Sequence, residues 1–377
     1  MAENDGRSTQ PVIVAARDEW LRDAGGREYI DVSMGYGSVW LGHNHPAVTR
    51  ALVSQLERYA APGYLPTGTL EAAEAALRQF IPDTHYLGGI YSTGMEAMET
   101  ALRAACVHTG RTAIAGFSDS THGRSFVTAA IGGESSTGGF EFVHRLPSFA
   151  AARPNELTVG LRQLAQRAAL AAIVVEPIQM TGGGYEIPEA VCTALFGLAR
   201  EYAIPVLFDE TLTGLYRCGR QFFFEGTGGV PDLLVIGKGM GNGFPCAAVV
   251  LRKGFTWDRK KVRPGSTFWN HPLACVAVTT TLQELRRLRP MDKVREIEAV
   301  ITAVLGRLEL RGRGAMWCLR VPDSARQADF AQRILHAGVI VSYYEGYIRL
   351  LPPLTIGLDV LAQACDTIRK SYADTFG

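Results

Sequence analysis

The sequence lacks both an excess of charge and any long apolar run. Its 377 residues carry 38 basic and 37 acidic side chains, for a formal net charge of +1. Such a balance gives no reason to expect nucleic acid or an anionic membrane as a partner. No stretch approaches the roughly 18 uninterrupted apolar residues of a membrane helix, and the first thirty residues have no apolar core of the signal-peptide type. We therefore expect a soluble, cytoplasmic protein that binds neither membranes nor nucleic acid.

Cysteine is scarce and scattered, and the common metal and nucleotide motifs are missing. The seven cysteines stand singly, without a C-x-x-C pair, which argues against a disulfide framework in so long a chain. His43 and His45 stand close together, but no cysteine or carboxylate flanks them, so we expect no metal. The spacing of a nucleotide phosphate loop, G-x-x-x-x-G-K followed by Ser or Thr, is also absent.

The middle of the chain alternates short apolar runs with helix-like segments. Candidate buried strands span 113–117, 173–176, 206–209, 233–236 and 247–251. Residues 189–203 have the i, i+3, i+4 apolar spacing of a helix packed on a sheet. This alternation is typical of βα units and predicts an α/β fold with a largely parallel sheet.

The two ends of the chain follow different patterns. Residues 26–44 are Gly-rich and hairpin-like. Helical patterns cover 291–308, 325–337 and 358–374, and short apolar runs lie at 338–342 and 347–351. We predict a smaller α+β domain built from both termini, residues 1–44 and 271–377, and a large domain of residues 45–270.

A helix start near residue 93 offers a seat for a phosphate group. Thr93-Gly94-Met95-Glu96 has the form of a capping box, with Thr93 as the cap. Such a start leaves the amides of Gly94 and Met95 free at the positive end of the helix dipole, where anions bind. Because capping boxes are common, an ordinary helix start is the alternative reading.

Two predicted strands end in an acid, and a third is followed by a lysine. Glu176 follows IVV and Asp209 follows VLF. In open α/β sheets, ligands gather at the carboxyl ends of strands. Lys238 follows the strand LLVI and lies among glycines 237, 239, 241 and 243. A lysine held in such a desolvated place has a lowered pKa and can attack a carbonyl group.

Together, these segments resemble the class III (fold type I) aminotransferases that depend on pyridoxal 5′-phosphate (PLP). The resemblance covers nearly the whole chain in the family's order. It rests on GGREYIDV…LGHNHPAV, STGMEAMETALR, HGR at 122–124, VEPIQ, DET-x-TG with R-x-G, PDLLVIGKGMGNGFP, STFWNHPLAC, RGRGAMWCLRV and IRLLPPL. It implies a large PLP-binding domain with a mostly parallel seven-stranded sheet flanked by helices, and a smaller α+β domain.

The resemblance also implies a role for each conspicuous residue near the cofactor. Lys238 would form the internal aldimine and then move a proton between the substrate and the cofactor. Asp209 would pair with the protonated pyridine nitrogen, which keeps the ring an electron sink. Thr93, Gly94 and Met95 would form the phosphate seat.

Five further residues complete the implied site. Thr121, His122 and Thr211 would line the cofactor pocket. Thr267 would bind the phosphate of the partner subunit's cofactor, which makes a homodimer with shared active sites the functional unit. A fifth position, Arg349, would hold a substrate carboxylate through a two-pronged hydrogen bond.

Three segments depart from the family's usual pattern. Thr211 and Leu212 stand where Val and Gln are usual, and Leu212 cannot donate a hydrogen bond to the cofactor's phenolic oxygen. Thr121 replaces the aromatic residue that usually stacks on the ring. Met180-Thr181 replaces Gly-Glu or Gly-Ala. In the ornithine and 4-aminobutyrate branches that Glu pairs with the substrate-binding arginine, and Thr181 cannot do so.

These departures leave two reactions open. The first is transfer of an amino group from a primary amine or amino acid to a keto or aldehyde acceptor, which we predict. The alternative is another PLP reaction on the same scaffold, namely epimerisation, decarboxylation or carbon–carbon bond formation. A relative without catalysis is the third reading, and the presence of both Lys238 and Asp209 argues against it.

Overall fold

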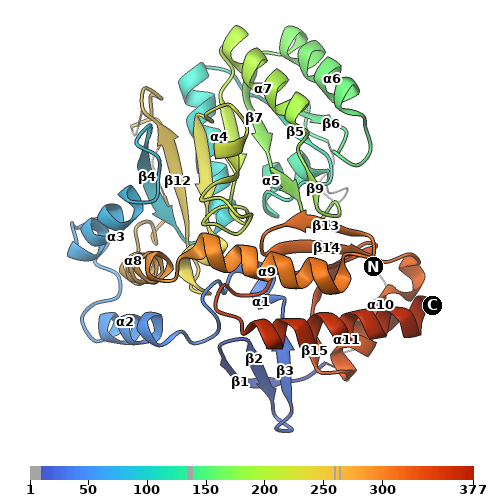
Figure 1. Ribbon diagram of the computed structural model, residues 1–377. Helices are drawn as coiled ribbons and strands as arrows, with labels where there is room; N and C mark the ends of the chain where they lie inside the picture. Colours follow the sequence, from blue (N-terminus) through green and yellow to red (C-terminus); the bar gives the residue numbers. More distant parts are fainter. Residues whose placement is uncertain (1–9, 134–138, 259, 263–264) are drawn as a thin grey trace.

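The computed structural model describes residues 10–133, 139–258, 260–262 and 265–377. Its largest element is a sheet of seven strands in the order β4-β12-β11-β10-β7-β5-β6 (Figure 1). The strands are β4 (His85–Tyr91), β5 (Ala113–Phe117), β6 (Val143–Leu146), β7 (Leu170–Val175), β10 (Val206–Asp209), β11 (Leu233–Ile236) and β12 (Ala247–Arg252). All five strands expected from the sequence are present.

The sheet is mostly parallel, as predicted, with one strand reversed. The pairs β6–β5, β5–β7, β7–β10 and β10–β11 are parallel. Strand β12 is antiparallel to both of its neighbours, β11 and β4. The segment between β11 and β12 holds only the short 3₁₀ turn η4 (Lys238–Gly241). A parallel return needs a crossover of a dozen or more residues, so this short connection forces the reversed direction.

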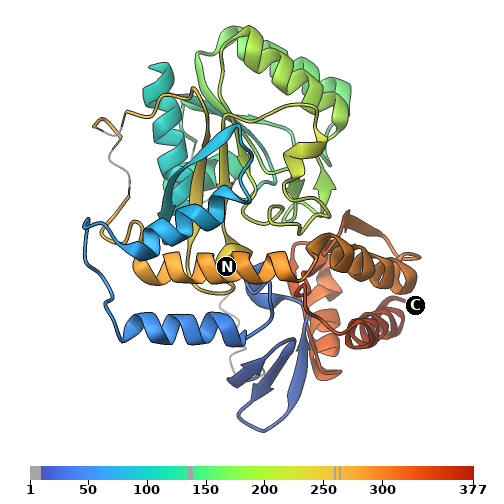
Figure 2. The same ribbon diagram turned by 60° about the vertical axis from the view of Figure 1, so that its left-hand side comes forward.

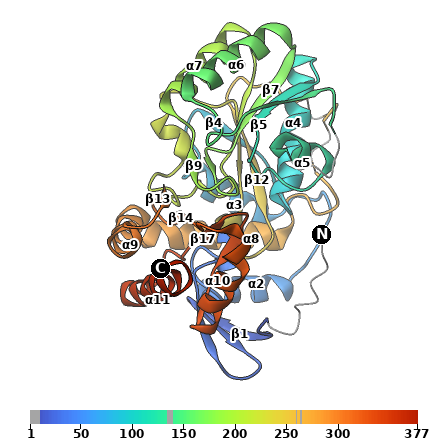
Figure 3. The ribbon, with the colours of Figure 1, turned by 90° about the vertical axis from the view of Figure 1, so that its right-hand side faces the viewer.

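Helices cover both faces of the sheet. The helices of this part are α2 (Pro46–Leu56), α3 (Gly68–Arg78), α4 (Gly94–Thr109), α5 (Phe126–Gly132), α6 (Pro154–Arg167), α7 (Glu189–Glu201) and α8 (Pro272–Arg287). Figure 3 shows α4 and α5 on one side of the sheet and α6 and α7 on the other. Alternate residues of β10 accordingly enter two cores: Leu207 packs with the α4 side and Phe208 with the other. Burial on both faces explains the continuous apolar runs of these strands.

A four-stranded sheet joins the two ends of the chain. It contains β1 (Ile13–Arg17), β2 (Trp20–Asp23), β3 (Glu28–Asp31) and β15 (Val339–Ile340), in that order. The hairpin expected at 26–44 is wrong beyond Asp31. The true hairpin is β2–β3, and the chain then turns into α1 (Met34–Gly37), where Tyr36 has φ 58°. The glycines at 35 and 37 serve this turn, since both have positive φ.

The C-terminal part adds a second four-stranded sheet and three helices. The strands are β13 (Leu310–Arg313), β14 (Met316–Arg320), β17 (Tyr347–Leu350) and β16 (Ser342–Tyr344). The helices are α9 (Pro290–Leu305), α10 (Gln327–His336) and α11 (Leu358–Phe376). The apolar run at 338–342 divides between β15 and β16, which belong to different sheets.

The remaining short elements are β8 (Ile178–Gln179), β9 (Tyr185–Glu186), η3 (Phe223–Gly226) and η5 (Ser324–Arg326). In Figure 2, α8 runs between the large sheet and the N-terminal strands, and it packs on both α2 and α3. The domain boundaries at residues 44 and 270 stay a prediction. Across the described residues we find no helix with the length and apolar character needed to cross a membrane.

Candidate active site

The predicted site residues gather at the carboxyl edge of the large sheet. Asp209 is the last residue of β10, Glu176 directly follows β7, and Lys238 follows β11 after a single glycine. The three strands are parallel neighbours, so their carboxyl ends meet at one edge, where such sheets bind ligands.

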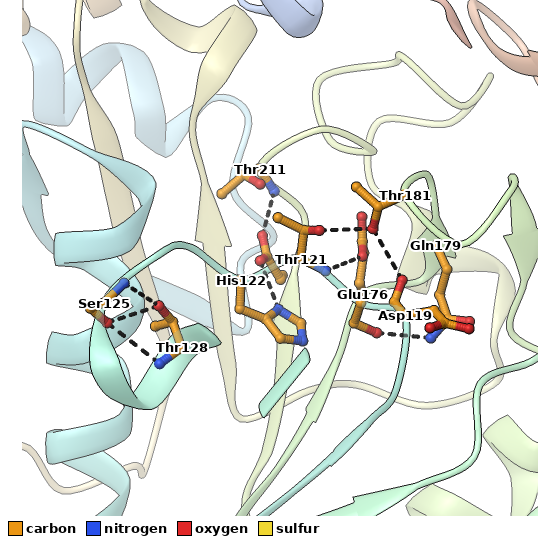
Figure 4. A network of polar contacts seen from close by, with 11 residues as sticks. Asp119, Thr121, His122, Ser125, Thr128, Glu176, Gln179, Thr181 and Thr211 are labelled. Atoms are coloured by element: carbon orange, nitrogen blue, oxygen red, sulfur yellow. Dashed lines mark hydrogen bonds and ion pairs between the residues drawn. The ribbon is translucent and has the colours of Figure 1, made fainter. Parts of the chain in front are cut away.

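Asp209 is held by a histidine from the loop between β5 and α5. The Nδ1 of His122 lies 2.9 Å from Oδ2 of Asp209, and both side chains are buried (Figure 4). The backbone amide of Thr211 donates to Oδ1 of the same carboxylate at 3.1 Å. Burial by itself would raise the pKa of Asp209, but the hydrogen bond and charge of His122 outweigh it and lower that pKa. Asp209 is therefore an ionised carboxylate in a dry place.

Glu176 is a second buried acid beside Asp209. Its Oε2 accepts a 2.7 Å hydrogen bond from the backbone amide of Thr121. Burial raises the pKa of Glu176 to about 7, with the His122 charge opposing the rise and the Asp209 charge adding to it. The sequence predicts Glu176 as a candidate only from its place at a strand end, and the family resemblance assigns it no role.

Lys238 begins the turn η4 in an unusual backbone conformation. Its φ is +44°, which is rare for a residue with a side chain and marks stored strain of the kind found at functional sites. Burial lowers the pKa of the Lys238 amine, and the charges of Glu176 and Asp209 oppose this fall. The following residue, Gly239, must lack a side chain, because a Cβ there would lie 2.9 Å from Cβ of Trp40.

The start of α4 has unused backbone amides, as the capping pattern predicts. The hydrogen bond of the Glu96 side chain, however, differs from that of a standard capping box. Thr93 caps the helix by accepting from the amide of Glu96 at 3.1 Å. The Glu96 carboxylate bonds the amide of Ser92 at 3.0 Å, one residue earlier than in a standard capping box. Among the described residues, no protein acceptor takes the amides of Gly94 and Met95. The positive end of this helix therefore faces outward with unused donors.

Arg349 lies in the middle of its sheet, between Cys318 of β14 and Ser342 of β16. It is only 9% exposed, and its Nε has no hydrogen-bond partner in the described part of the chain. The guanidinium lies 5.5 Å from the centre of the Tyr36 ring. Burial lowers its pKa, while the charge of nearby Glu176 raises it. A buried, incompletely bonded arginine is suited to an anionic ligand.

The three unusual positions have defined surroundings. The Oγ1 atoms of Thr121 and Thr181 are 2.8 Å apart, and Thr181 also donates to the Asp119 carbonyl at 3.1 Å. Figure 4 shows this pair beside Glu176. Leu212 is buried, and its Cδ1 would lie 2.7 Å from a Cβ at Gly37. The threonine pair was not foreseen, because residues 121 and 181 are far apart in the sequence.

Thr267, a predicted site residue, lies away from the other site residues within one chain. It lies on the exposed loop before α8, and its side chain makes no hydrogen bond to any described residue. This exposure is compatible with a contact to a second subunit, which the single chain does not contain.

Arg217 is a buried arginine that the sequence indicates only as the first residue of the R-x-G segment. Its guanidinium donates to the carbonyls of Ala315, Leu351, Pro352 and Gly37 at 2.7–3.4 Å. It also lies 3.7 Å over the Trp40 ring. Since Leu351 and Pro352 closely follow Arg349, these hydrogen bonds hold the segment that carries Arg349.

Two further features were considered as candidate sites, a second hollow and a cluster of metal-binding side chains. A hollow of about 620 Å³ lies at the opposite edge of the sheet, beside Val206 and Asp232 at the starts of β10 and β11, and none of the predicted site residues lines it. In the ranges that the structure describes, no three His, Cys, Asp or Glu side chains gather as metal ligands would.

Comparisons with known proteins identify the family of the chain. The family described as Aminotransferase class-III matches residues 1–371. The 4-aminobutyrate aminotransferase of Mycobacterium tuberculosis is 29% identical over 412 residues, which cover 97% of this chain and 92% of that protein. The acetylornithine aminotransferase of Bacillus subtilis is 28% identical over 378 residues, covering 96% and 94%. An engineered omega transaminase from Pseudomonas jessenii has the same fold, with a TM-score of 0.89 at 18% identity and coverage of 97% and 93%.

The residues at the sheet edge fit PLP. An amine for its aldehyde, an ionised acid for its ring nitrogen and a helix start with unused amides for its phosphate are all present. The named relatives are aminotransferases, and nothing in the comparisons favours the non-transaminating alternative. The chain belongs to the class III aminotransferase family and is a PLP-dependent aminotransferase.

Proposed function

We propose that Lys238 is the residue that carries PLP, and that the enzyme moves an amino group from a carboxylate-bearing amine to a keto or aldehyde acceptor. The observation that carries this proposal is the meeting of Lys238 and the ionised Asp209 at one edge of the sheet. Bound PLP supplies an electron-poor ring that stabilises negative charge on the substrate carbon.

The buried residues would each perform a definite task. His122 keeps Asp209 ionised through the 2.9 Å hydrogen bond, so that Asp209 can hold the ring nitrogen in its charged form. Lys238 Nζ, whose pKa burial lowers, can take a proton from the substrate carbon and return it elsewhere. Such a proton carrier works best when its pKa is near the working pH.

The phosphate and the substrate would be held by separate groups. The unused amides of Gly94 and Met95 and the positive helix end suit the phosphate. Arg349, buried and with a free Nε, suits a substrate carboxylate. Thr181 cannot serve this arginine as an acid partner, so the proposal does not extend to the relatives' substrates.

A homodimer and a cytoplasmic setting belong to the same proposal. Large apolar side chains are exposed at Tyr64, Leu65 and Phe268. Phe268 directly follows Thr267, and Tyr64, which precedes Leu65, is in ring contact with Trp269. A partner subunit would cover them, and Thr267 would then reach the partner's phosphate. All seven cysteines are free thiols, as expected in a reducing compartment.

Two measurements test the proposal. Lys238→Ala should abolish the covalent attachment of PLP that borohydride traps in the native enzyme, while exposed Lys253→Ala should retain it. A trapped adduct in the Lys238→Ala protein would refute the assignment. Holoenzyme incubated with a panel of amino acids should release keto acid in stoichiometric amount. Release of carbon dioxide, or solvent deuterium exchange without keto acid, would refute amino transfer.

A further inference from the structure

A polar hollow of about 640 Å³ opens beside the candidate active site. Its lining residues include four that carry a hydroxyl group, Thr121, Thr181, Tyr344 and Tyr347. Thr121 connects the hollow to the site, because its amide bonds Glu176 and the next residue, His122, bonds Asp209. The hollow is far larger than a small amino acid requires and is therefore available to a longer substrate chain.

The hydrogen-bond directions at the threonine pair determine what this wall can bind. Thr181 uses its hydroxyl proton on the Asp119 carbonyl. In the 2.8 Å contact between the two hydroxyls, Thr121 must therefore be the donor. The remaining lone pairs of Thr121 Oγ1, which is exposed to the hollow, can only accept. The wall next to the site is thus suited to a ligand with hydroxyl or N–H donors.

The charges around the hollow do not favour a second anion there. Arg124 is opposed by Asp119 and Glu345, which line the same hollow. An apolar chain would also be a poor occupant, because it would leave the four hydroxyl groups without their water partners. Neutral, hydroxylated chains meet both conditions.

The hollow and Arg349 face the same side of strand β17. Tyr347 and Arg349 are two residues apart on this strand, so their side chains point the same way and are about 7 Å apart along it. Tyr347 is fixed in place, since its ring lies directly on Gly183, where φ is +96° and no side chain fits. A chain of about six carbons bridges a separation of this size.

We propose that the substrate is an amino acid or keto acid with a hydroxylated chain of about six carbons, and that the hollow is the subsite for its hydroxyl groups. Thr121 and the two tyrosines would bind these groups, with the carboxylate on Arg349. The inference rests on the proposed function, because it takes Arg349 as the carboxylate-binding group.

Two probes that cannot undergo amino transfer test the subsite in the holoenzyme. D-gluconate and n-hexanoate share a carboxylate and a six-carbon chain, but only gluconate has hydroxyl groups. Isothermal titration calorimetry should show gluconate binding about tenfold more tightly, the fold-change for one or two net hydrogen bonds. The double variant Thr121→Val/Thr181→Val should reduce this preference to less than threefold.

Matched variants exclude a general loss of structure. Thr121→Ser keeps the hydroxyl group and should keep the preference. Thr302→Val, on the exposed surface of α9, should leave it unchanged. Equal affinity for the two probes in the native enzyme, or an unchanged preference in the double variant, would overturn the subsite.

The two proposals fail in different ways. If keto acid is released from ordinary amino acids but the enzyme binds gluconate no more tightly than hexanoate, only the subsite is wrong. If no amino donor yields keto acid, the proposed function is wrong whatever the probes do.

Discussion

At the scale of single residues, His122 controls the ionisation of Asp209, the proposed partner of the ring nitrogen. Its hydrogen bond and charge offset the burial that would otherwise raise the pKa of Asp209. In His122→Asn this pKa should rise, so that Asp209 becomes protonated at higher pH. The acid limb of the profile of kcat/KM against pH should then move to higher pH by about one unit. Exposed His336→Asn is the control, and an unmoved acid limb in His122→Asn would contradict the expectation.

Glu210 gives a second prediction at the same scale, on stability. The buried carboxylate accepts bonds from the amides of Phe223 and Phe224 and from the Thr213 hydroxyl. Burial raises its pKa to about 7 from 4.5, although these donors lower it. The folded protein then holds a proton that the unfolded chain releases between pH 4.5 and 7. The stabilisation is therefore present at low pH and is lost as pH rises through this window.

Neutral Glu210→Gln should remove this dependence. The unfolding free energy of the variant minus that of the native enzyme should increase between pH 5.5 and 8, by at most roughly 3 kcal/mol. Urea unfolding at fixed subunit concentration measures both values. Exposed Glu57→Gln serves as the control. A difference that stays constant with pH would show that Glu210 ionises normally.

At the scale of elements, the N-cap of α4 should serve both helix stability and PLP binding, whereas the N-cap of α3 should serve helix stability alone. Both helices have a threonine N-cap: Thr93 accepts from Glu96, and Thr67 accepts from Leu70. Replacing either threonine by alanine should lower the unfolding free energy by about 1 kcal/mol. Only Thr93→Ala should also weaken PLP binding, because only α4 points its free amides at the proposed phosphate seat. Equilibrium dialysis of PLP checks this. Equal PLP affinity in the two variants would place the phosphate elsewhere.

At the scale of the whole molecule, Arg217 joins segments from three regions of the chain. Its four carbonyl acceptors belong to the N-terminal segment, the β13–β14 turn and the residues after β17. Burial lowers its pKa to about 9. Arg217→Lys should lose about 3 kcal/mol of unfolding free energy, since a lysine cannot reach all four carbonyls and leaves some buried without a donor. Denaturant unfolding beside exposed Arg200→Lys measures the loss, and equal stability of the two variants would contradict this role.

The patterns of the sequence alone were enough for five of the strands in the large sheet, for their mostly parallel arrangement and for the positions of Lys238 and Asp209 at strand ends. Strands β5, β10 and β11 begin and end as predicted, because a strand buried on both faces needs a continuous apolar run that ends where the polar site begins. Each of these features depends on residues close together in the chain, so the local pattern of apolar and polar residues predicts it.

The tertiary structure alone decided the rest. The reversal of β12, the contact between Thr121 and Thr181, the carbonyl cluster around Arg217 and the hollow that Thr121 and Tyr347 both line all depend on residues from distant segments. No periodicity in a sequence encodes such meetings, since they are fixed by how helices and sheets pack in three dimensions. For that reason the family and its cofactor could be inferred from the residues in order, whereas the proposed subsite required the folded chain.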